Sequence, residues 1–165
     1  LYWEASGKSA LKADLGYTKQ SFDEFDDRDY NGSTGRLTYF WKMTGKTKLD
    51  FSAWRETSTK TDEVTTYVLT KGASITPTWS VTPIIKGTGK FEYENDDFKG
   101  QNDIVTDLGG QRRDDDTWRL GIGATWSPRQ YLSLSLDYRY EDRDSSIDSN
   151  DFTAKQWDAR AKVQF

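Results

Sequence analysis

Apolar and polar residues alternate with a period of two along most of this chain. In residues 131–140, leucine and tyrosine occupy every second position from 132 onwards, and serine or a charged residue fills most positions between. A helix would repeat every 3.6 residues, so this alternation predicts β-strands with one apolar and one polar face. The expected strands are residues 1–5, 9–23, 34–43, 47–59, 64–76, 81–94, 117–127, 131–144 and 151–165. The 165 residues are thus predicted to form a single all-β domain.

The expected connections between these strands alternate in length. Short turns are predicted at 7–8, 44–46, 78–79 and 127–129, and long polar connections at 24–33, 60–63, 95–116 and 145–150. Short turns at one end and long loops at the other are typical of outer-membrane barrels, and strands of about ten residues match a bilayer. We therefore predict an antiparallel up-and-down transmembrane β-barrel of eight to nine strands in the bacterial outer membrane. The alternative is a soluble sheet whose aromatic residues pack across neighbouring strands.

Missing residue types exclude several functions. The chain contains neither cysteine nor histidine, which excludes disulfides, Ser-His-Asp catalysis and Cys-His catalysis. Its net charge of -4 gives no electrostatic argument for a nucleic-acid partner. Aromatic residues make up 15% of the chain, which argues against disorder.

The alternation assigns side chains to the two faces of the predicted barrel. The residues expected to face lipid are Leu132, Leu134, Leu136, Trp126 and Val163. The residues expected to line the lumen are Arg36, Trp54, Arg119, Asp137, Arg139 and Arg160, and Phe40 also falls inward. Charges of both signs on the inner face fit either a hydrated channel that contacts a sugar chain or ion pairs that fill a closed barrel. Single-chain bacterial barrels have even strand numbers, so a count of nine indicates either the C-terminal part of a larger barrel or eight strands that close alone.

Particular motifs resemble one family. Residues 34–56 and 112–142 carry a TGRL strand opening, a TGK turn and a WSPR turn that leads into LSLSLDYRY, and the chain ends in KVQF. This pattern resembles the EpsL-type outer-membrane β-barrel family of exosortase-associated exopolysaccharide operons. The resemblance implies a role in polysaccharide export and implies that residues 1–165 are the C-terminal part of a longer barrel. Phe165 resembles the terminal signal that outer-membrane proteins present to the barrel-assembly machinery.

Other motifs do not indicate catalysis or metal binding. Residues 45–47 read Gly-Lys-Thr but lack the earlier glycine and the helix of a phosphate-binding loop. Residues 27–32 match the first half of a calcium loop, but Thr38 stands where the bidentate glutamate belongs. Carboxylate pairs are abundant, and nothing distinguishes one pair as an acid and base. We assign no catalytic, cofactor-binding or metal-binding residue, and we expect no cofactor and no enzyme activity.

Three functional hypotheses remain open from the sequence. The first is a passive channel for an exopolysaccharide, the second is a structural or adhesive barrel with a filled interior, and the third is a soluble all-β binding module. The expected partners of a barrel are outer-membrane lipid and lipopolysaccharide, the barrel-assembly machinery, and a polysaccharide with periplasmic export proteins. Strand closure and an open interior distinguish the first two hypotheses.

Overall fold

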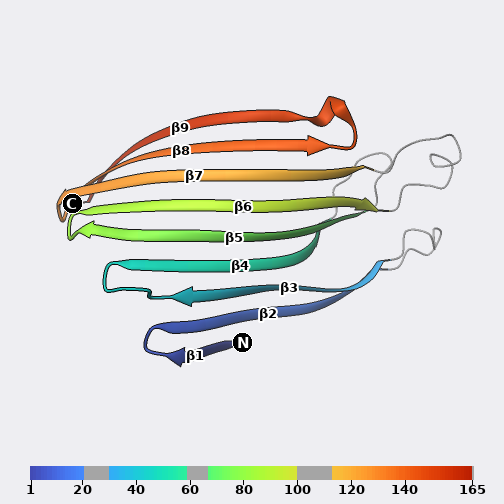
Figure 1. Cartoon of the computed structure of the whole chain (residues 1–165), viewed down its shortest axis with the longest axis horizontal. Coiled ribbons are helices and arrows are strands. Elements are labelled where there is room, and N and C mark those ends of the chain that lie inside the picture. Colours follow the sequence, from blue (N-terminus) through green and yellow to red (C-terminus); the bar gives the residue numbers. More distant parts are fainter. Residues whose placement is uncertain (21–29, 59–66, 100–112, 165) are drawn as a thin grey trace, which may run out of the picture.

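The chain folds into one antiparallel sheet of nine strands that follow chain order, β1 to β9 (Figure 1). The computed structural model describes residues 1–20, 30–58, 67–99 and 113–164. The strands are β1 Tyr2–Ser6, β2 Ser9–Gln20, β3 Tyr30–Trp41, β4 Thr47–Ser58, β5 Tyr67–Thr82, β6 Ile85–Lys99, β7 Asp114–Arg129, β8 Leu132–Ser145 and β9 Phe152–Val163. The predicted all-β, up-and-down arrangement is therefore confirmed.

Short turns connect the strands at one end of the sheet, which we call the turn end, and longer connections lie at the other, the loop end (Figure 1). The short connections at residues 7–8 and 44–46 are confirmed. The turn predicted at 78–79 is wrong, because Thr78 pairs with Thr88 and Trp79 pairs with Gly87 inside the β5–β6 hairpin. The chain reverses at residues 83–84 instead. Pro83 is suited to this turn because proline has no N–H to donate to a neighbouring strand.

Other predicted boundaries also differ from the structure, among them the start of β3, which is Tyr30 rather than residue 34. Strand β7 continues through Pro128 to Arg129, with a register shift after Trp126, so the turn lies at 130–131 rather than 127–129. The connection predicted at 95–116 is shorter, because β6 extends to Lys99 and β7 begins at Asp114. Acidic residues weakened the strand prediction there, although the alternation itself continues.

The two edges of the sheet are β1 and β9. Because every neighbouring pair is antiparallel, all odd-numbered strands run in the same direction, and β1 and β9 point the same way. Among the described residues, these edge strands do not pair with each other. Within the same described ranges, the structure has no helix that is long and apolar enough to cross a membrane.

Most large apolar side chains are exposed rather than packed in a core. The buried apolar residues of the described chain are only Trp54, Val68, Leu69 and Phe98. By contrast, Ile122 is 56% exposed and Leu136 is 52% exposed. Many other apolar side chains on the same face of the sheet are also exposed. A soluble protein rarely exposes so continuous an apolar surface, so this face is suited to contact with lipid.

Candidate functional site

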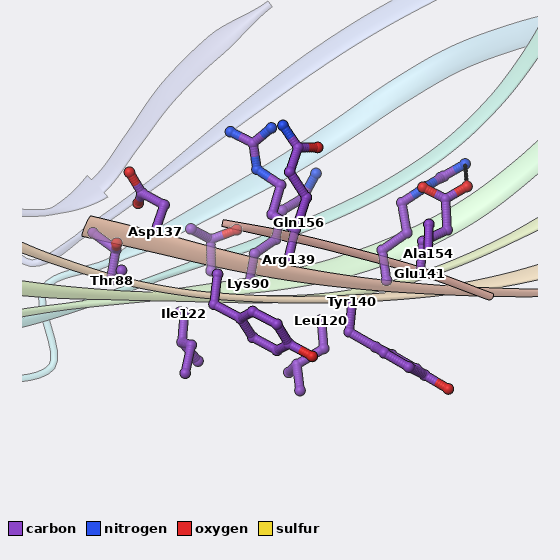
Figure 2. Close-up of a pocket in the computed structure, with 16 residues that line it drawn as sticks. Thr88, Lys90, Leu120, Ile122, Asp137, Arg139, Tyr140, Glu141, Ala154 and Gln156 are labelled. Atoms are coloured by element: carbon purple, nitrogen blue, oxygen red, sulfur yellow. Dashed lines mark hydrogen bonds and ion pairs between the residues drawn. The ribbon is translucent and has the colours of Figure 1, made fainter. Parts of the chain in front are cut away.

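The sheet separates its side chains into an apolar outward face and a polar concave face. Figure 2 shows Leu120, Ile122 and Tyr140 on one side, and Thr88, Asp137 and Arg139 on the other, toward which the sheet curves. Strand register extends this division, because residues opposite each other on neighbouring strands share a face. The polar concave face is the candidate functional site.

Arg119 of β7 is the centre of an ion-pair cluster on the concave face. Its guanidinium Nη1 lies 3.1 Å from Glu92 Oε1 and 3.0 Å from Glu94 Oε1, and its Nε lies 3.2 Å from Glu141 Oε2. Lys90 and Arg143 extend this cluster, with Lys90 Nζ 2.6 Å from Glu92 and Arg143 Nη2 3.8 Å from Glu141. Three strands, β6, β7 and β8, are therefore joined by charges of opposite sign, and Arg119 is not free to attract an anion.

A second polar cluster lies nearer the loop end. Asp115 is 1% exposed, accepts a hydrogen bond from Ser145 Oγ at 2.5 Å and pairs with Arg113 Nη2 at 2.6 Å. The Arg113 guanidinium also lies 4.2 Å from the centre of the Phe98 ring. These groups, together with buried Val68, fill the concave face of β5 to β8 at this end.

Trp54 faces inward as predicted, but its ring is covered. The Arg36 guanidinium lies 4.5 Å from the Trp54 ring centre and also pairs with Glu56 at 3.0 Å. On the neighbouring strand, the ring lies so close to Gly72 that a Cβ there would be 2.3 Å from Trp54 Cζ2. Trp54 is 7% exposed, so its indole ring is packed against neighbouring side chains and is not accessible to a sugar in this conformation. The absence of a side chain at Gly72 is what makes room for the indole.

We expect Gly72→Ala to lower the free energy of unfolding by about 1–3 kcal/mol, because the added methyl group displaces the Trp54 ring. Gly121→Ala is the matched control, since a Cβ at Gly121 meets only Lys90 Cβ, at 3.5 Å. The control should change stability by less than about 0.5 kcal/mol or raise it slightly. Denaturant titration of the two variants in detergent, followed by tryptophan fluorescence, measures the difference. Equal effects would contradict the proposed close packing of Trp54 on Gly72.

A hollow of about 550 Å³ lies beside the Arg119 cluster, toward the turn end. Gly121 and Gly123 of β7 line it, and so do Lys90, Arg139 and Gln156, which are labelled in Figure 2. Gly123 leaves space for Asp137, whose Oδ1 would lie 2.2 Å from a Cβ at that position. The hollow therefore presents hydrogen-bond donors and acceptors around an unfilled volume.

A smaller hollow of about 460 Å³ lies on the concave face of β1 to β4, close to the turn end. Its aromatic lining residues are Tyr2, Phe40 and Trp41, of which Tyr2 is 59% exposed. Lys8, Lys42 and Lys48 line it as well, with Glu4 and Asp50 as the acids. Phe40, predicted to face inward, thus contributes to an accessible depression.

The strand register shows on which face of the sheet each predicted site residue lies. Arg36, Trp54, Arg119, Asp137, Arg139 and Arg160 lie on the concave side by register. They do not form one group, because Arg119 and Arg139 share the larger hollow, whereas Arg160 pairs with Ser135, four positions along β8 from Arg139 toward the turn end. On the outward side, Leu134 pairs with Trp126 and Leu132 pairs with Val163, and Leu136 lies between Ala124 and Ala159. Phe165 lies outside the described residues.

Among the charged residues of the concave face that sequence reasoning missed are Glu94, Asp96, Asp115 and Arg143, all near the loop end. They lie beyond the ends predicted for their strands or at those ends. The signal was present, because Glu92, Glu94, Asp96 and Phe98 alternate with residues of the opposite face. Among the described residues, no group of three or more acids is arranged to hold a metal ion.

Of the comparisons with known proteins, the match to a family model agrees with this architecture. The family model described as "Putative beta-barrel porin 2" matches residues 6–165. A solved structure of Ail, the attachment invasion locus protein of Yersinia pestis, is similar at 14% identity and a TM-score of 0.33, over 96% of this chain and 99% of that one. No match is found among curated proteins.

Proposed function

The chain belongs to the beta-barrel porin family that matches residues 6–165 and is an antiparallel β-barrel protein of the bacterial outer membrane, and we propose that it lines a passage for an extracellular polysaccharide. The observation that carries this proposal is the larger hollow of the concave face, about 550 Å³ in volume and bordered by charged and amide side chains. The EpsL-type motifs of residues 34–56 and 112–142 support the choice of a polysaccharide. The proposed role is passive and requires neither catalysis nor a cofactor.

The chemistry of the larger hollow suits a hydroxyl-rich polymer. Sugar hydroxyls both donate and accept hydrogen bonds, so a contact surface for them needs both kinds of group. Lys90, Arg139 and Gln156 supply donors, and the carboxylate of Asp137 supplies acceptors. Arg139 remains largely available, because its side chain is 61% exposed and its Asp158 contact is long, at 3.8 Å.

The smaller hollow favours an acidic polymer over a neutral one. Three lysines against two acids leave it with a positive balance. The exposed Tyr2 ring offers an apolar surface on which a sugar ring can stack, as aromatic rings do with bases and other flat faces. Both hollows lie on the concave face, so one chain passing along this face could contact both.

The second candidate function is a membrane anchor with a filled interior. The Arg119 cluster and the buried Asp115 cluster favour it, because they occupy the concave face of β6 to β8 toward the loop end. Small barrels with filled interiors do not conduct, whereas barrels of sixteen or more strands enclose water. Conductance therefore distinguishes the two functions.

We expect the purified protein to form channels in a planar bilayer, and Arg139→Gln with Arg160→Gln to shift their ion selectivity toward cations. The shift follows from removal of two positive charges from the lumen wall, which lowers the local concentration of anions. The reversal potential in a salt gradient measures it. Arg55→Gln with Lys71→Gln is the matched control, because it removes the same charge from the outward face and should leave selectivity unchanged.

The result that would overturn the proposed passage is a protein that folds, as judged by its β-sheet circular dichroism, but gives no channels. Such a result favours the anchor. Block of the channels by acidic oligosaccharides, and not by neutral ones of equal length, would support an acidic polymer as cargo.

A further inference from the structure

A pair of cations stands on the outward face at its margin with the loop end. Arg55 of β4 and Lys71 of β5 are direct cross-strand partners, and both are exposed. Like charges that face each other destabilise a strand pair when nothing compensates them. Within the described ranges, neither side chain forms an ion pair with a carboxylate. The pair is therefore suited to an anion supplied from outside the protein.

The charge of this margin changes sign around the sheet. The row that contains Arg55 and Lys71 continues through Asn95 of β6 to Asp116 of β7 and Asp144 of β8. Asp116 accepts hydrogen bonds from Tyr93 at 2.5 Å and from Asn95 at 3.1 Å. An anion is consequently attracted to β4 and β5 and repelled from β7 and β8, which makes the basic pair a local site.

An apolar groove begins directly beside the basic pair. One row closer to the middle of the sheet, about 7 Å along the strands, Ala53 faces Ala73. Their small side chains lie among larger ones, with Leu37 on one side and Tyr93 and Trp118 on the other. Phe51 and Phe91 extend the groove, whose volume is about 570 Å³. The groove is predominantly apolar and lies on the outward face of the sheet.

We propose that Arg55 and Lys71 together with the groove over Ala53 and Ala73 bind a phosphorylated, acylated lipid of the loop-side leaflet. A headgroup phosphate would lie between the two cations, and an acyl chain would lie along the groove. Tyr93 and Trp118 are neighbours in this row, and aromatic residues of membrane proteins are enriched at the depth of the lipid headgroups. The basic pair would therefore lie at the depth of the headgroups, and the groove would extend from there toward the acyl chains. Long loops of such barrels are extracellular, and the lipid is therefore of the lipopolysaccharide class. This site does not depend on whether the concave face conducts.

The test measures binding of the purified protein in detergent to lipid A and to its dephosphorylated form, by native mass spectrometry. The wild type should bind lipid A more tightly than the dephosphorylated form. Each cation near an anionic surface contributes about 1 kcal/mol, so Arg55→Gln with Lys71→Gln should weaken lipid A binding about 30-fold and abolish the preference. Ala53→Phe should weaken the binding of both lipid forms, because the phenyl ring fills the groove while the two cations remain in place.

The matched control is Lys46→Gln with Lys155→Gln, which removes the same charge at the turn end and on the outward face of β9. It should retain the wild-type affinity for lipid A. Equal binding of the two lipid forms by the wild type would overturn the proposal, as would equal effects of the test and control pairs. Phosphatidylglycerol bound as tightly as lipid A would show an unselective lipid surface and would likewise contradict it.

Discussion

Replacing Ile122 with arginine is expected to lower the stability of the folded barrel in a bilayer by about 2–4 kcal/mol. Ile122 lies midway between Trp118 and Trp126 on the outward face of β7, and these residues are about 27 Å apart along the strand. Aromatic residues mark the two membrane interfaces, so the midpoint corresponds to the bilayer centre. The side chain is 56% exposed and would bring a guanidinium into hydrocarbon. Reversible unfolding from lipid vesicles by denaturant measures the loss.

Two further arginine substitutions test this assignment of face and depth. Leu134→Arg should cost no more than about 1 kcal/mol, because Leu134 faces outward beside Trp126 near the interface. Ser135→Arg should also be mild, because its side chain lies on the concave face opposite Thr125. A loss at Ser135 as large as that at Ile122 would contradict the assigned faces, and a loss as large at Leu134 would contradict the assigned depth.

Arg119→Gln is expected to lower the free energy of unfolding by about 2–3 kcal/mol. Removing one partner of a buried ion pair costs about 3–5 kcal/mol, and the value is smaller here because the Arg119 side chain is 28% exposed to solvent. The substitution leaves Glu92, which is only 8% exposed, beside Glu94 and Glu141 with less positive charge to balance them. Denaturant unfolding at neutral pH measures the effect.

Arg160→Gln provides the control for Arg119. It removes the same charge from the concave face, but Arg160 forms no ion pair with any residue in the described part of the chain, so we expect a change below about 0.5 kcal/mol. Combining Arg119→Gln with Glu92→Gln should recover part of the stability, since the unpaired carboxylate is then removed as well. No recovery would indicate that Arg119 stabilises the sheet by packing rather than by charge.

The sequence predicted the division between faces better than it predicted the contacts within each face. Alternation assigned Leu136 outward and Asp137 inward, because successive side chains of a strand point to opposite faces of the sheet. It could not show that Trp54 is covered, because that depends on Gly72 of the next strand and on the rotamer of Arg36. Only the register brings those three residues together.

Strand ends were the least predictable part of the fold. The turn predicted at Thr78 and Trp79 follows directly after Pro77, yet Pro77 lies within β5, where its missing N–H coincides with a gap in the β5–β6 pairing. The acids of residues 114–116 read as a loop because charge normally indicates solvent. In the structure, Arg113 and Ser145 satisfy Asp115, so a strand can carry it. Ser145 lies thirty residues from Asp115 in the sequence, so this hydrogen bond leaves no local signal.

The glycines below the larger hollow have a mechanical consequence. Gly87 and Gly89 of β6 and Gly121 and Gly123 of β7 lie in neighbouring strands, and the register places the first two on the outward face and the last two on the concave face. These four positions carry no side chain of their own, so fewer side chains resist bending of the sheet there. Lateral pressure from the bilayer should bend the sheet at these glycines more readily than at the Arg119 cluster, where ion pairs join β6, β7 and β8. The same two strands, β6 and β7, thus combine an easily bent region at the glycines with a more rigid region at the Arg119 cluster.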